Sequence, residues 1–196
     1  SSSSSSSSGG GGGGGVSRRQ SRARQSFQRV LSTKVVSESA LLSEEHIDAL
    51  IDAMPDRFRQ HKWDLQYSTT RDGISLHTLY RKTAKTAPSV MVVKDRQDHV
   101  FGVFAPDPWK VHHKFYGTGE TFVFKLEPDL AVWHWNQAEH SEKKRNNFFL
   151  FSTDDCIAVG GGGHFALWLD EDLLYGNSTV CTTFNNDCLA GSEVFQ

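Results

Sequence analysis

Four consecutive glycines near the C-terminal end form the pattern in this chain that most invites a chemical interpretation. A run such as Gly160, Gly161, Gly162 and Gly163 can cradle phosphate groups, because glycine lets backbone N–H groups approach a ligand closely. A phosphate-binding loop, however, continues with Lys and Ser or Thr, and a dinucleotide-binding fingerprint opens a helix. Here the run continues into H-F-A-L-W-L at 164–169, which has the composition of a strand. We therefore expect the glycines to be structural and to bend the chain between two core strands.

The histidines and cysteines do not form a pattern typical of a metal centre. His112 and His113 are adjacent, so on a strand their rings would point to opposite faces. Cys156 and Cys181 fall in apolar, strand-like runs and are expected in the core. Cys188 is the thiol with the best prospect of exposure and is the candidate for redox chemistry. No metal and no cofactor are predicted.

Acidic residues stand on both sides of the glycine run. Asp154 and Asp155 precede it and 170–172, D-E-D, follow it, a pattern that could suggest a cation site or an acid/base pair. Turn and edge positions explain these carboxylates as well, and neither convergent histidines nor a nucleophile accompany them. No catalytic residue is predicted, and we expect a protein that is not an enzyme.

Two helices are predicted in the first half of the chain. Ser43 is a typical N-cap, and the two glutamates after it lie where the helix dipole favours negative charge. Apolar residues then recur at helical spacing over 47–54 until Pro55 stops the pattern. A second, short helix is predicted over 76–85.

Most of the remaining chain has the pattern of short strands. Trp63, Leu65 and Tyr67 alternate with polar residues, as a half-buried strand requires, and 90–93 with 100–104 predict a hairpin. Further strands are predicted over 122–126, 130–135, 148–151, 156–159, 165–169 and 179–184. Because the strands are short and evenly spaced and the helices precede them, the sequence predicts an α+β domain that is mainly β. We expect a two-sheet antiparallel β-sandwich flanked by short helices.

Charge is unevenly distributed along the chain. The formal net charge is −2, but six of the 21 basic residues precede the first acidic residue, Glu38. The remainder holds 15 basic and 23 acidic residues and carries −8. Binding of nucleic acid by the domain is not expected, because phosphate contacts need concentrated positive charge. Residues 1–37, which begin with a Ser and Gly run, are expected to be a disordered basic tail, and 41–196 the folded domain.

The chain lacks the signals of a membrane or secreted protein. No apolar run reaches the roughly 20 residues that span a bilayer, and no signal-peptide region is visible. Three cysteines without a disulfide pattern favour the cytoplasm. The Ser- and Arg-rich start also has the composition of a transit peptide, so organelle targeting by the tail stays an alternative.

Several motifs together resemble the TLDc domain of the oxidation-resistance proteins. The first motifs are W-D-L-Q-Y-S at 63–68, G-I-S-L-H-T-L-Y at 73–80 and F-G-V-F-A at 101–105. F-Y-G-T-G-E at 115–120, I-A-V-G-G-G-G-H-F-A-L-W-L-D-E-D-L-L-Y-G at 157–176 and C-T-T-F-N at 181–185 follow. The motifs stand in the family's order over nearly all of 41–195.

The resemblance implies a fold, a role and a partner. The fold is a two-sheet sandwich, and the role is resistance to oxidative damage without an established catalytic mechanism. Members of the family bind the peripheral sector of the vacuolar-type proton ATPase and regulate its assembly, which implies a cytoplasmic location at endomembranes. Two features depart from the family pattern. The loop at 136–147 is longer than in the animal members, and the chain stops before the family's last strand.

As an interaction domain, the chain offers contacts around 115–120 and in the loop at 136–147. The candidate contact residues are Trp109, Tyr116, Gly117, Gly119 and Glu120. Glu120 is expected at the surface, because burying an unpaired carboxylate is costly. Two alternatives stay open. One is a thiol-dependent, peroxide-detoxifying enzyme, and the other is a stress-response signalling scaffold regulated by phosphorylation of Ser21 and Ser26.

Overall fold

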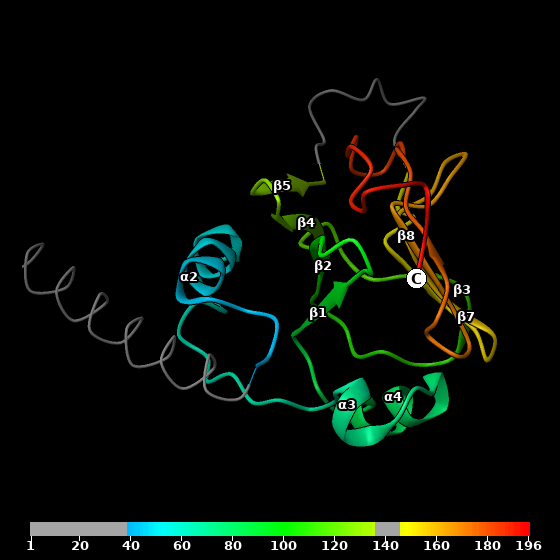
Figure 1. The fold of residues 1–196 in the computed structure, drawn as a ribbon, viewed down its shortest axis with the longest axis horizontal. Helices are drawn as coiled ribbons and strands as arrows, with labels where there is room; N and C mark the ends of the chain where they lie inside the picture. Colours follow the sequence, from blue (N-terminus) through cyan, green and yellow to red (C-terminus); the bar gives the residue numbers. More distant parts are fainter. Residues whose placement is uncertain (1–38, 136–145) are drawn as a thin grey trace, which may run out of the picture.

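The computed structural model describes residues 39–135 and 146–196. The predicted tail and most of the loop predicted at 136–147 therefore lie outside the described residues. Within these ranges the chain forms one four-stranded and one six-stranded antiparallel sheet together with three short helices (Figure 1). The predicted fold class, a mainly β sandwich flanked by short helices, is confirmed.

Helix α2, Glu44–Ala53, follows the predicted cap. The Ser43 hydroxyl accepts a hydrogen bond from the backbone N–H of His46 (3.2 Å), and Nδ1 of His46 accepts one from the backbone N–H of Ser43 (3.3 Å). This reciprocal arrangement satisfies N–H groups that the first helical turn leaves without partners. The helix ends directly before Met54 and Pro55. Its buried residues are Ile47, Leu50 and Ile51.

The segment 63–67 is not the strand that its alternation predicts. It runs without strand partners, and the short helices α3, Thr69–Asp72, and α4, Leu76–Thr83, follow it. The carbonyl of Gln66 accepts a hydrogen bond from Arg71 Nη2 at 2.8 Å instead of from a neighbouring strand. Trp63 and Tyr67 are partly buried but Leu65 is exposed, so the alternating residues do not form one buried side. A side chain supplies the backbone partner here.

The four-stranded sheet has the order β1-β2-β4-β5, and the six-stranded sheet has the order β10-β9-β8-β7-β6-β3. The first sheet consists of β1 (Ser89–Lys94), β2 (Val100–Ala105), β4 (Phe122–Glu127) and β5 (Ala131–His134). The second consists of β3 (His112–Tyr116), β6 (Leu150–Ser152), β7 (Cys156–Val159), β8 (Leu167–Asp170), β9 (Gly176–Asn177) and β10 (Val194–Phe195). Both sheets are antiparallel throughout.

Seven of these strands overlap strands predicted from the sequence, while β3, β9 and β10 are additional. The last two have two residues each, too few for alternation to appear. The strand predicted over 179–184 is wrong. Its residues 182–184 form a turn, and the backbone N–H of Cys181 is held by the Asn186 side chain at 3.3 Å. In this segment the apolar run indicates burial of side chains, but the backbone does not pair with a neighbouring strand.

The core lies between the two sheets, and a second apolar layer lies outside the four-stranded one. Phe101 and Val103 of β2 point into the core between the sheets, against Ile157 and Leu167. Phe104, which alternates with them, points to the opposite face, where Leu50 and Met54 of the α2 region pack. Helix α2 thus covers the outer face of the four-stranded sheet (Figure 1).

A buried carboxylate closes the β1–β2 hairpin. Asp95, with 1 % of its side chain exposed, accepts hydrogen bonds from the backbone N–H groups of Gln97 (2.8 Å) and His99 (2.9 Å). It also accepts one from the N–H of Gly191 at 3.4 Å and lies 3.2 Å from His99 Nδ1. One side chain therefore fixes the hairpin turn and ties it to the C-terminal loop, 96 residues away.

We expect Asp95→Asn to lower the free energy of unfolding by about 1–3 kcal/mol, because the amide group places a donor against backbone donors. Asp98→Asn is the matched control in the same turn. Asp98 is exposed, its ion pair with Lys94 is on the surface, and asparagine tolerates its φ of 67°. Urea unfolding of both variants measures the difference. Equal midpoints would contradict the anchoring role of Asp95.

Candidate interaction surface

The turn at 117–120 connects the two sheets. It begins where β3 ends, with Gly117 at a φ of 101°, a conformation that favours glycine. The N–H of Thr121 donates to the carbonyl of Thr118 (3.0 Å) and closes the turn before β4. At Gly119, a Cβ would lie 2.2 Å from Cε3 of Trp135, so the indole lies directly against the backbone. Any larger residue would displace the ring.

Glu120 forms an ion pair across a large sequence separation. Its carboxylate accepts a hydrogen bond from Arg57 Nη2, and 30 % of the Glu120 side chain is exposed. Arg57 also lies over the Phe58 ring, 4.4 Å from its centroid. The turn is therefore fastened to the segment after α2. Nothing in the sequence near Glu120 points to Arg57, and Trp135 stands out only as the end of an apolar, alternating strand.

The five predicted contact residues differ in their burial. Trp109 is a core residue, 2 % exposed, and its indole N–H donates to the Ser89 hydroxyl at 3.1 Å. The expectation that Trp109 contacts a partner is therefore corrected, since its ring is already enclosed. Tyr116 is half-buried and hydrogen-bonded to Ser152 (2.8 Å). Gly117, Gly119 and Glu120 reach the surface together.

The glycine run forms the connection between β7 and β8. Three of its glycines have positive φ: 75° at Gly160, 88° at Gly162 and 122° at Gly163. A Cβ at Gly160 would lie 2.6 Å from the Cys181 sulfur, and one at Gly162 would lie 1.8 Å from the Thr182 hydroxyl. The N–H of Gly161 already donates to the Thr183 hydroxyl at 2.9 Å. The positive φ angles and the close contacts together explain why glycines stand at these positions.

All three thiols are engaged in hydrogen bonds, and those of Cys181 and Cys188 are donors. Cys181 is buried and donates to Asn186 Oδ1 at 3.1 Å, and burial raises the pKa of its thiol. Cys188, the predicted redox candidate, is half-buried and donates to the carbonyl of Ser178 at 3.0 Å. Cys156 lies 3.4 Å from the Thr153 hydroxyl. A carbonyl acceptor stabilises the protonated thiol, whereas reaction with peroxide needs the thiolate.

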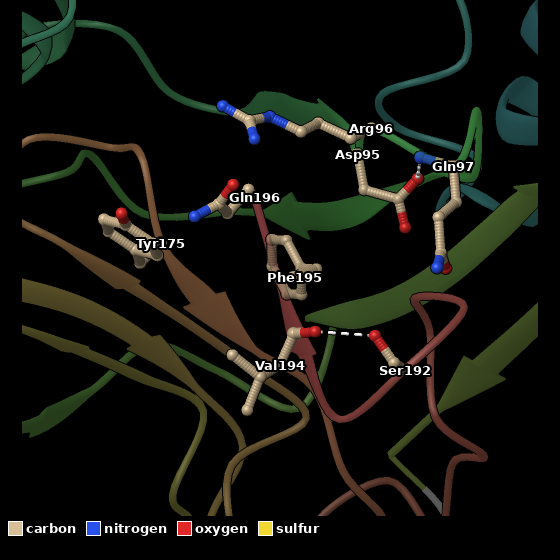
Figure 2. Close-up of a pocket in the computed structure, with 8 residues that line it drawn as sticks. All are labelled: Asp95, Arg96, Gln97, Tyr175, Ser192, Val194, Phe195 and Gln196. Atoms are coloured by element: carbon tan, nitrogen blue, oxygen red, sulfur yellow. Dashed lines mark hydrogen bonds between the residues drawn. The ribbon is translucent and has the colours of Figure 1, made fainter.

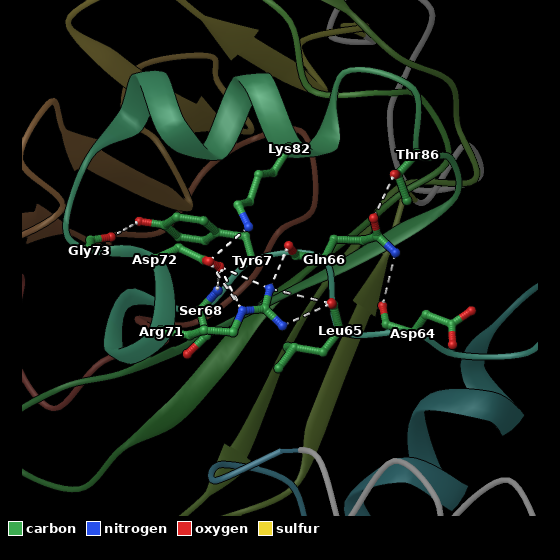
Figure 3. Close-up of polar contacts among 10 residues, drawn as sticks. All are labelled: Asp64, Leu65, Gln66, Tyr67, Ser68, Arg71, Asp72, Gly73, Lys82 and Thr86. Atoms are coloured by element: carbon green, nitrogen blue, oxygen red, sulfur yellow. Dashed lines mark hydrogen bonds and ion pairs between the residues drawn. The ribbon is translucent and has the colours of Figure 1, made fainter.

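A polar cluster around Asp72 holds the 65–73 segment against α4 (Figure 3). The carboxylate lies 2.9 Å from Arg71 Nη2 and 2.8 Å from Lys82 Nζ, and it accepts a hydrogen bond from the N–H of Ser68 at 3.0 Å. These three donors, the Arg71 side chain foremost, lower the pKa of Asp72 well below its usual range. The same carboxylate therefore anchors the extended segment, α3 and α4.

A cavity of about 320 Å³ lies beside β10 (Figure 2). Its lining residues are Asp95, Arg96, Gln97, Tyr175, Ser192, Val194, Phe195 and Gln196. None of them belongs to the predicted contact set. Within 39–135 and 146–196, no group of three His, Cys, Asp or Glu side chains is placed to hold a metal ion. In the same ranges, no helix is both long and apolar enough to cross a membrane.

Comparison with known proteins gives one family and several relatives. The TLDc domain model matches residues 35–196. Nuclear receptor coactivator 7 of Mus musculus is 42 % identical over 159 residues, covering 80 % of this chain and 16 % of that protein. Oxidation resistance protein 1 of Rattus norvegicus is 44 % identical over 159 residues, with 80 % and 18 % coverage. The chain thus matches less than a fifth of the length of these relatives.

We expect Gly162→Ala to destabilise the fold more than Gly163→Ala. Both residues have positive φ, which costs alanine about 1–2 kcal/mol. Only Gly162 adds a clash with Thr182, worth roughly a further 1–3 kcal/mol, because nothing lies within 4 Å of a Cβ at Gly163. Thermal and urea unfolding measure both variants. Equal destabilisation would show that packing at the bend is looser than described.

The ion pairs of Asp72 predict how the stability of the fold depends on pH. Because the folded-state pKa of Asp72 lies below the ordinary value of 3.8, its stabilisation is complete above that value. The contribution is lost as pH falls through the folded-state pKa. Asp72→Asn should therefore be less stable than the wild type near neutral pH, and the two should converge in acid. Urea midpoints measured from pH 7 downward test this, and a constant difference would contradict it.

Proposed function

Because the chain belongs to the TLDc domain family, we propose that it is a non-enzymatic interaction domain that protects cells against oxidation by docking onto a protein partner. The observation that most supports the proposal is that two contacts hold the 117–120 turn in place. Trp135 packs beneath Gly119, and Arg57 pairs with Glu120. A turn held in place by such contacts loses little conformational entropy on binding, which favours its use as a docking element.

We propose the peripheral sector of the vacuolar-type proton ATPase as the partner, with docking from the cytoplasmic side of endomembranes. This choice rests on the family resemblance. The contact residues that suit it are Gly117, Gly119 and Glu120, with the hydroxyl of Thr118 between them. A carboxylate beside exposed backbone groups would recognise a cationic side chain of the partner. Within this chain, the Glu120 carboxylate already pairs with one cationic side chain, that of Arg57.

The thiol-dependent alternative has less support. Hydrogen bonds from Cys181 and Cys188 to oxygen acceptors favour the protonated sulfur. A peroxide-reactive cysteine needs the opposite environment, in which a nearby positive charge lowers the thiol pKa. The signalling alternative depends on Ser21 and Ser26, which lie outside the described residues.

We expect the protein to bind purified peripheral ATPase sector in biolayer interferometry, and Glu120→Lys to weaken binding about tenfold through charge reversal in the contact. Asp129→Lys is the matched control. It makes the same charge change at an exposed residue of the β4–β5 turn, and we expect it to bind like the wild type. Circular dichroism should show that both variants are folded.

Three outcomes would contradict the proposal at different points. No binding by the wild type would remove this partner. Equal weakening by both variants would show that net charge, rather than the 117–120 turn, controls binding. Peroxide consumption by the pure protein that Cys188→Ser abolishes would favour the enzyme alternative.

A further inference from the structure

The outer faces of the two sheets differ. Helix α2 covers the four-stranded sheet through Leu50 and Met54. The six-stranded sheet has no helix over its outer face within the described residues, and it lies on the side of the molecule away from α2 (Figure 1). An uncovered sheet face is normally polar, because alternation places charged or hydroxyl side chains toward water.

The middle of this uncovered face is instead apolar and aromatic, while Asp170 and Asn177 lie on the same face next to it. Ladder register places Phe151 of β6 beside Ala158 of β7, and Ala158 beside Trp168 of β8. Phe115 of β3 lies on the same side, with ring centroids 5.3 Å from Phe151 and 4.6 Å from Phe148. The Phe148 side chain is 38 % exposed. We call these five residues the aromatic stripe. Phe115, Phe151 and Trp168 are partly exposed, and Ala158 is buried. A partly exposed aromatic surface of this kind usually marks an interaction site.

Acidic turns border the stripe at one end. Asp154 and Asp155 form the β6–β7 turn, and Glu171 and Asp172 follow β8. In an antiparallel sheet these two turns lie at the same end, opposite the glycine bend. All four residues are exposed, and none forms an ion pair within the described part of the chain. The occupant that fits is apolar and positively charged.

We propose that residues 16–36 of the same chain bind this face, with apolar side chains on the aromatic stripe and basic side chains toward the acidic turns. The segment holds six basic residues and no acidic one, together with apolar residues such as Phe27 and Leu31. A second copy of the domain fits less well, because its net charge of −8 would oppose the same acidic turns. The proposal does not depend on the ATPase partner.

The chain is long enough for this contact. Residues 27–38 span up to about 40 Å when extended. Two packed sheets and one covering helix are roughly 20 Å thick between layer centres. The segment can therefore pass around the edge of the sandwich from α2 to the opposite face. Because the segment and the face share one chain, even weak contacts would be occupied through high effective concentration.

A photo-crosslinker in the full-length chain tests the proposal. Phe27 is replaced by p-benzoylphenylalanine, the protein is irradiated at low concentration, and the crosslinked peptides are identified by mass spectrometry. We expect crosslinks within one chain to peptides that contain Phe148, Phe151 or Trp168. The same crosslinker at Ser5 is the position control and should give none of these products.

Two surface variants then test the chemistry of the contact. Asp154→Lys should lower the crosslinking yield about fivefold, because it replaces an attraction to the basic segment by a repulsion. The effect stays moderate because exposed ion pairs are individually weak and the apolar contact remains. Asp129→Lys, an equal charge change on the other sheet, should leave the yield unchanged. Phe151→Gln should lower the yield as well, with folding checked by circular dichroism. Crosslinks spread over other surfaces, crosslinks only between chains, or equal yields for both lysine variants would each overturn the proposal.

Discussion

The burial of β2 on both faces is the constraint on which the rest of the structure depends. Phe101 and Val103 enter the core between the sheets, while Phe104 enters the layer beneath α2. Gly102 has no room for a side chain, because a Cβ would lie 1.9 Å from the carbonyl oxygen of Met91. A strand packed this way must be central, with partners on both edges, and β1 and β4 supply them. The position of α2 and the closure of the sandwich both follow.

The candidate surface lies where the chain passes from one sheet to the other. The 117–120 turn leaves β3 in the six-stranded sheet and enters β4 in the four-stranded one. Beneath it, Trp135 from the end of β5 meets Phe149 edge to face, with ring centroids 5.1 Å apart. Both rings join the layer between the sheets, so the turn rests on the rigid core itself. Relative motion of the sheets would disturb the turn, which links surface geometry to core packing.

Several polar side chains of the described residues form their hydrogen bonds and ion pairs with other parts of the fold. Asp95 binds backbone N–H groups of its own hairpin, Asp72 joins two helices to an extended segment, and the Cys181 and Cys188 thiols donate to nearby oxygen atoms. Groups satisfied in this way stabilise a single arrangement and are poor nucleophiles or bases. The turn around Gly119 and the aromatic stripe differ from these groups, because they lie at the surface and are not enclosed by the fold.

The sequence by itself determined the capped helix from Ser43, the four strands of one sheet and half of the strands of the other, the fold class and the family. Helix caps, period-two alternation and ordered motifs are local signals. It also indicated that the glycine run is a bend, since a strand follows it. Only the tertiary structure decided that Trp109 is enclosed, that 63–67 and 179–184 lack strand partners, and that Arg57 meets Glu120. Residues far apart along the chain decide burial and pairing, and an apolar run has the same appearance whether a strand, a side chain or a turn completes its hydrogen bonds.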